Sequence, residues 1–303
     1  MANRNDLIDE VLLSLAGYLT DQELLGTTAS SLTASVTSFT VTGSVFPDGS
    51  GFQPGIAEID GELVYVGSVN PGTGAFTNVI RGYGGTTAAA HTIDSIVRAN
   101  PRVPKVKVLR AINDTIDEVY PKLYAIDETQ ITAYDFVTSY DLPADAVDVI
   151  SVSVQEPGLA SAYRASYRWQ FIANPSDESA TGKQIQVGDA WTGSEIHVVY
   201  ATAPTKFSET WATNEDFSTA TGLPDWCREV ITLGAAYKVM AFLDAGRIAE
   251  RTAEGDLIAM QSPIGTAQKL SQHLFALYTE RMNRAEARLR SQYDVGSIHY
   301  KMW

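Results

Sequence analysis

The chain has 303 residues, of which 45% are hydrophobic and 19% charged, as in an ordinary globular protein with room for two or three modules. Its net charge is −14, whereas a protein that binds nucleic acid by neutralising phosphates should be basic. No apolar run approaches the roughly 20 residues of a membrane span, no signal peptide is expected at the start, and a single cysteine excludes an internal disulfide.

Residues 1–26 are predicted to hold the N-terminal helix of a helical body. Asn5 suits an N-cap, and Gly26 is expected to close the element. The apolar stripe that predicts the helix is Leu7, Ile8, Val11, Leu12, Leu15 and Leu19.

Residues 27–100 predict a small antiparallel β barrel or sandwich inserted after the first helix. Ser, Thr and Gly dominate its first half. Two strands flanking Asp60-Gly61 predict a hairpin with a tight turn. A further strand at Ala75–Ile80 leads into the glycine-rich segment Arg81–His91.

Residues 101–128 are expected to return to the helical body, and residues 129–210 to form a second β region. Pro121 should end or kink the helix. The helical stripe is Val106, Leu109, Ile112, Ile116, Val119 and Leu123. The strand candidates of the second β region are Ala146–Gln155, Tyr167–Ala173, Gln184–Val187 and Glu195–Ala201.

Residues 211–293 predict a pair of helices that forms the hub of the core. The first runs from Gly222 to about Ala245 and loses nearly all its polar face past Leu233, so it should be buried on most sides. This core either belongs to one chain or is shared with a neighbouring subunit. For the shared core, the packing residues would be Trp226, Val230, Gly234, Tyr237 and Phe242.

The second helix of the pair, from about Ile264 to Tyr293, would be roughly 40 Å long. One face of this helix carries Arg281, Arg284 and Arg288. Surface ion pairing of these arginines with Glu280 and Glu286 is favoured over contact with DNA. Residues 294–303 are then predicted to be a C-terminal docking arm, with an arm folded onto its own domain as the alternative. The residues expected to bind a partner are Ile298, Tyr300, Met302 and Trp303.

The sequence offers little catalytic chemistry. Its four histidines lie far apart, and no zinc-binding or nucleophile motif occurs, so no catalytic residue, cofactor or metal is expected. Cys227 lies on the hub helix and is expected to be an inert core thiol. Glu58, Asp60 and Glu62 have the chemistry of a glycosidase pair, but a solvated rim around the hairpin is the favoured interpretation.

Two segments of the predicted barrel resemble a motif of structural proteins from tailed bacteriophages. The first is the run Ala57–Val66, and the second is Ile80–His91, which reads Ile-Arg-Gly-Tyr-Gly-Gly-Thr-Thr-Ala-Ala-Ala-His. One extra glycine, Gly84 or Gly85, lengthens the loop relative to the motif. Arg81, Thr86 and His91 are expected to close this loop by hydrogen bonds.

Three further segments resemble phage head-to-tail adaptor proteins. They are Val103–Leu123, Leu142–Val152, and Leu223–Tyr237. The order of the predicted elements indicates an α+β fold: a helical-bundle body of four main helices, with two antiparallel β insertions and an extended C-terminal arm. The resemblance implies that such a helical bundle assembles as a ring, although the two insertions make this chain larger than simple adaptors.

The resemblance also implies a function without enzymatic activity. The chain would be a structural virion protein at the neck, assembled in the host cytoplasm. It would form a homo-oligomeric ring, a dodecamer as is usual in that family, beneath the portal protein and would meet a stopper or tail protein. Genomic DNA would pass through the ring without specific binding, and no membrane would be involved.

Two other functions remain open from the residues alone. A tail-tip or baseplate protein would use its β modules to bind carbohydrate, with Tyr167, Trp169 and Trp191 as stacking residues if they are not core. A cell-wall hydrolase would depend on the hairpin carboxylates.

Overall fold

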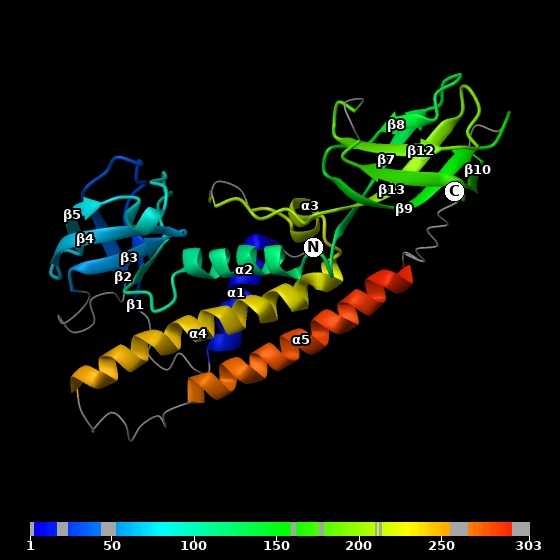
Figure 1. The fold of residues 1–303 in the computed structure, drawn as a ribbon. Helices are drawn as coiled ribbons and strands as arrows, with labels where there is room; N and C mark the ends of the chain where they lie inside the picture. Colours follow the sequence, from blue (N-terminus) through cyan, green and yellow to red (C-terminus); the bar gives the residue numbers. More distant parts are fainter. Residues whose placement is uncertain are drawn as a thin grey trace.

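The computed structural model describes residues 3–16, 24–43, 53–158, 162–175, 179–209, 211, 214–254 and 266–292, with only the backbone of 24, 242–254 and 266–268. These residues form 13 strands and five α-helices (Figure 1). The expected α+β class, a helical-bundle body carrying two β insertions, is therefore wrong. Strands are the majority of the elements, and each β region has an apolar core of its own. The helical periodicities identified the helices, whereas four strands were not predicted because they lack a clear alternating pattern.

The first β region is a closed six-stranded barrel with the order β1-β2-β5-β4-β3-β6. β1 lies where the sequence predicted the end of a helix, because Leu24-Leu25 fits either pattern. Phe76, Val64 and Val97 are fully buried in the interior. The strands are β1 (Leu24–Thr28), β2 (Phe39–Gly43), β3 (Gly55–Ile59), β4 (Glu62–Asn70), β5 (Ala75–Ile80) and β6 (Ile96–Ala99).

The predicted hairpin between β3 and β4 is confirmed. Ile59 pairs with Glu62, so Asp60 and Gly61 are the two turn residues, with φ of 48° and 88°. Positive φ at both positions is the signature of the turn that matches strand twist. Gly61 is also required by packing, since a Cβ there would lie 2.1 Å from the Trp211 ring.

The second β region consists of two sheets packed on one apolar core. Their strand orders are β10-β9-β13-β7 and β11-β12-β8. Val152 and Val198 of the first sheet share the core with Ile185 of the second. The strands are β7 (Ala125–Thr132), β8 (Ser139–Asp141), β9 (Ala146–Gln155), β10 (Tyr163–Ala165), β11 (Trp169–Ala173), β12 (Lys183–Val187) and β13 (Glu195–Thr202).

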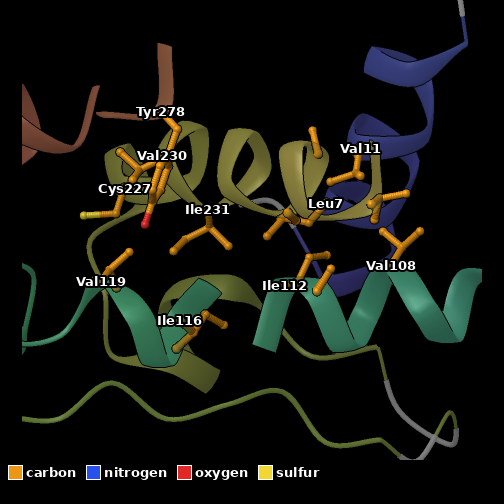
Figure 2. Packing of buried hydrophobic residues seen from close by; sticks show 14 of the residues in the cluster. Leu7, Val11, Val108, Ile112, Ile116, Val119, Cys227, Val230, Ile231 and Tyr278 are labelled. Carbon is orange, nitrogen blue, oxygen red and sulfur yellow. The ribbon is translucent and has the colours of Figure 1, made fainter. Parts of the chain in front are cut away.

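Four helices share a third apolar cluster between the two β regions. They are α1 (Arg4–Leu15), α2 (Lys105–Val119), α4 (Arg228–Glu254) and α5 (Thr266–Gln292); the short α3 (Phe217–Thr221) precedes α4. Figure 2 shows side chains of α1, α2 and α4 meeting around Ile231, with Tyr278 of α5 beside Val230. α2 ends before Pro121, as expected. α4 runs to Glu254, beyond the end predicted at about Ala245.

Candidate functional site

The glycine-rich segment of the phage-like motif folds over the β3–β4 hairpin and is fixed there by Glu62. Both oxygens of Glu62 accept hydrogen bonds from Arg81, from Nε at 2.8 Å and from a terminal nitrogen at 2.7 Å. Two further donors of Arg81 bind the carbonyls of Thr33 and Ala89 at 2.7 and 2.6 Å. A two-pronged guanidinium–carboxylate pair is among the stronger polar contacts in proteins.

Glu62 receives three further hydrogen bonds from the segment that it holds. The backbone N–H groups of Gly82 and Ala89 donate at 2.9 and 3.0 Å, and His91 Nε2 lies 2.8 Å away. Burial alone would raise the pKa of Glu62, but His91, Arg81 and the two backbone donors lower it to about 2. The side chain is therefore a buried, fully ionised anchor.

His91 connects this anchor to the hairpin turn. Its Nδ1 lies 3.0 Å from an oxygen of Asp60, and its side chain is 3% exposed. Burial favours the neutral ring, but the two carboxylates prevail and raise the pKa of His91 above its usual value. The imidazolium can then donate from both nitrogens. We call Asp60, Glu62, Arg81 and His91 the Glu62 clasp.

Thr86 and the first glycine of the motif complete the closed segment. Thr86 Oγ1 donates to the Tyr83 carbonyl at 2.9 Å and accepts from the Leu63 N–H at 3.1 Å. Gly82 has a φ of 62°, and a Cβ there would lie 2.9 Å from the Thr86 carbonyl oxygen. The prediction that Arg81, Thr86 and His91 close the loop is confirmed.

The solvated rim expected from Glu58, Asp60 and Glu62 is wrong for the two glutamates. Glu58 is 1% exposed and Glu62 is 2% exposed, while the Asp60 carboxylate is half-exposed. Each glutamate binds an arginine of the barrel, Glu58 with Arg98 and Glu62 with Arg81, because a buried carboxylate needs compensating donors. Neither is positioned as a free general acid or base.

Glu58 links the barrel to helix α2. One of its oxygens lies 2.5 Å from Arg98, its cross-strand partner on β6, and the other accepts the backbone N–H of Lys105 at 2.6 Å. The N-cap of α2 is Pro104, which provides no side-chain cap. Glu58 therefore supplies the missing acceptor at the positive end of the helix dipole, and the barrel and α2 are joined by a buried contact. Burial raises the pKa of Glu58, with Arg98 acting in the opposite direction.

The hub-helix residues predicted for subunit packing make contacts inside this chain. A Cβ at Gly234 would lie 2.3 Å from Thr115 of α2 and 2.9 Å from the Tyr278 ring of α5, so the glycine permits close approach of its own neighbours. Val230 is buried in the same cluster, and Tyr237 packs edge-on against Phe275 of α5. The side chain of Phe242 lies outside the described residues.

Trp226 and the arginines of α5 meet at the surface of the helix pair. Arg288 lies 4.7 Å over the Trp226 ring, and Arg281 pairs with Glu229 at 3.2 Å. Arg284 pairs with Glu280. The expected pairing with Glu280 and Glu286 is confirmed for Arg284 alone, because Arg281 pairs with Glu229 of α4 and Arg288 stacks on Trp226 of η3 (Asp225–Cys227).

The predicted docking arm, with Ile298, Tyr300, Met302 and Trp303, lies outside the described residues. The three aromatic residues proposed to stack on a sugar differ in how far their side chains are exposed. Trp169 and Trp191 pack against the core of the second β region, whereas Tyr167 is 89% exposed. Of the three, only Tyr167 is largely exposed.

Side chains able to bind metal ions do not cluster in the part of the chain that the structure describes. No group of three or more His, Cys, Asp or Glu residues there could hold a metal ion. Cys227 is buried, as expected, and burial raises the pKa of its thiol to about 12. Within the same residues, no helix is long and apolar enough to cross a membrane.

Comparison with known proteins identifies no relatives: no protein-family model matches the chain, and no curated protein gives a match.

Proposed function

We propose that this protein is a structural component of a tailed-phage virion, a head-to-tail adaptor that forms a ring beneath the portal and joins the capsid to the tail. One observation carries the proposal. In the barrel segments that resemble the virion motif, Arg81 and His91 both bind Glu62, and Arg81 and Glu62 also bind the surrounding backbone. These contacts stabilise the barrel itself, which is the role expected of such residues in a structural module.

The joint between the barrel and α2 supports the same function. An adaptor holds two neighbouring rings in fixed positions, so its own modules need fixed relative orientations. Glu58 gives the barrel such a connection through the N-terminus of α2, and Trp211 packs on the hairpin turn from the segment that precedes α3.

The acidic balance of the chain suits a channel through which DNA passes without adhesion. Like charges repel the phosphate backbone, and 36 acidic residues against 22 basic ones leave a strong excess. The C-terminal arm, with Ile298, Tyr300, Met302 and Trp303, would dock on the portal or on a neighbouring subunit, and the protein would reside in the virion neck.

Electron microscopy of the full chain mixed with the portal protein of the same virus tests this function. A ring of this protein on one face of the portal is the expected result. Labelling of intact virions with an antibody should place the protein at the neck. A label at the tail tip, or binding to host polysaccharide in place of the portal, would contradict the proposal and favour a carbohydrate-binding protein that uses the exposed Tyr167.

A further inference from the structure

The β7–β8 connection presents an aromatic side chain in a conformation that an L-residue rarely adopts. The Val137 N–H donates to the Tyr134 carbonyl at 3.3 Å, which defines a four-residue turn. Phe136 occupies its third position with a φ of 63°, where glycine or asparagine is normally required. Its side chain is fully exposed, at 105% of the reference area. A strained and exposed aromatic residue stabilises nothing within its own chain, so the strain points to a function.

The rest of the turn shares this exposure and is held firmly. Tyr134 is 64% exposed and Val137 is 43% exposed. The flanking Ala133 exchanges two backbone hydrogen bonds with Gly193 and Ser194, at 2.8 and 2.9 Å. The carboxylate of Asp135 is bound by Thr192. We call residues 134–137 the aromatic turn: a rigid apolar projection with one carboxylate at its centre, in which little order has to be gained on binding.

A groove with complementary chemistry lies between α2, α4 and the segment that leads out of the barrel. Its volume is about 270 Å³, slightly below the roughly 300–1,000 Å³ of small-molecule sites, so its size suits one or two side chains. Its apolar floor is formed by Val103, Ala111 and Val239.

The groove is cationic in a chain that is strongly acidic overall. Four of its lining residues are basic, Arg102, Lys107, Arg110 and Lys238, and one is acidic, Asp114. Of the four, Lys238 pairs with Glu118 of α2 at 2.7 Å, and the exposed Arg110 lies 3.9 Å from Glu209. Lys107 and Arg110 are exposed at its edge, and burial together with the charge of Arg110 lowers the pKa of Lys107. An incoming carboxylate would relieve this repulsion between like charges.

We propose that the aromatic turn of one copy of this chain inserts into the cationic groove of the next copy. Phe136 and Tyr134 contact the apolar floor, and Asp135 meets Lys107 and Arg110. The chain as a whole has a net charge of −14, but this groove is lined mainly by basic side chains. The aromatic turn offers a carboxylate and apolar side chains that match the groove, so a second copy of the same chain is the favoured occupant. The two surfaces lie on different modules, so the contact is heterologous, and such contacts close into rings when the rotation permits. The inference rests on the proposed ring-forming function and names the surfaces that build the ring.

Sedimentation analysis of the full chain with two complementary double variants tests this contact. The turn variant carries Tyr134→Ser and Phe136→Ser; the groove variant carries Lys107→Glu and Arg110→Glu. Wild type is expected to form oligomers as its concentration rises, whereas each variant alone should remain monomeric. An equimolar mixture of the two should form dimers and nothing larger, since each such dimer contains one intact turn and one intact groove.

Matched controls separate this contact from general effects of charge and hydrophobicity. Lys122→Glu with Lys206→Glu makes the same charge change at exposed sites, and Leu13→Ser with Ile93→Ser removes two exposed apolar side chains elsewhere. Both controls should assemble as wild type does, and circular dichroism should show all variants folded. Assembly of the turn or groove variant at wild-type concentrations would overturn the inference, as would a wild type that stays monomeric. Rings of wild type and of both variants on the portal would overturn the inference while supporting the adaptor function.

Discussion

The barrel and the second β region are stabilised by different kinds of interaction. The barrel combines an apolar interior with buried charged contacts, in which Glu62 receives five hydrogen bonds and Glu58 holds Arg98 and the start of α2. The second β region relies on an apolar core between two sheets, and its ion pairs, such as that of Arg164 with Asp189, are partly exposed. The barrel should therefore respond strongly to loss of single charges, whereas the second region should tolerate them.

The largest difference is expected from removing one arginine in each region. Arg81→Ala leaves the buried Glu62 without its main partner and should lower the free energy of unfolding of the barrel by about 3–5 kcal/mol. Arg164→Ala removes a half-exposed partner and should cost under about 1 kcal/mol. Amide hydrogen exchange resolved by region measures both, and equal effects would contradict the comparison.

A second contrast is expected in acid. The pKa of Glu62 is about 2 in the folded chain and 4.5 in the unfolded chain, so its contribution is present above pH 4.5 and is lost as the pH falls toward 2. This difference corresponds to about 3 kcal/mol of barrel stability. Exchange of barrel amides should accelerate in this range before that of the second region. Glu62→Gln should remove most of the pH dependence, and a dependence that persists in this variant would assign it to another group.

A smaller effect is expected as the pH rises above the ordinary pKa of histidine. Because the folded-state pKa of His91 is raised, its contribution is present below pH 6.5 and is lost as the pH rises through the folded value. A neutral ring still keeps one N–H donor, so the clasp loosens without breaking. His91→Gln should abolish the rise in amide exchange of residues 82–90 that accompanies loss of the ring proton. Titration of the His91 ring by NMR should show the raised pKa directly.

The smallest expected change is a gain of stability in the second β region. Phe136→Gly places a residue without a Cβ at a φ of 63° and should stabilise the chain by about 1 kcal/mol. A matched Tyr134→Ser variant, at a position without positive φ, should leave the melting temperature nearly unchanged. Destabilisation by Phe136→Gly would show that the ring packs within its own chain.

Local signals in the sequence located several of the elements, and their limits are physical. Asp60-Gly61 identified the hairpin because few residue pairs adopt two positive φ values in succession. Pro121 marked the end of α2 for a similar local reason. By contrast, β1, β7, β8 and β10 were missed, since short or edge strands carry weak alternation and gain their order from pairing with other strands.

The candidate site was only half visible. Arg81, Thr86 and His91 were recognised as loop-closing groups, but their shared acceptor, Glu62, was assigned to the surface. For the other buried glutamate, Glu58, the sequence did contain a signal. Glu58 and Arg98 each lie between apolar residues of a strand, a position where a charge is stable only with a buried partner. The aromatic turn and the groove were not found, because each is assembled from tertiary placement and exposure.

The pairing of the first and last barrel strands has a consequence for how this chain came to be built. Leu24 pairs with Ala99 and Thr27 with Ile96, so the chain enters and leaves the barrel through adjacent strands. A DNA segment encoding residues 24–99 thus specifies a closed unit whose two ends already lie side by side. Such a unit can be gained, lost or exchanged by recombination with only a short joint to rebuild, and the contact of Glu58 with the start of α2 is what a newly acquired copy would have to re-establish.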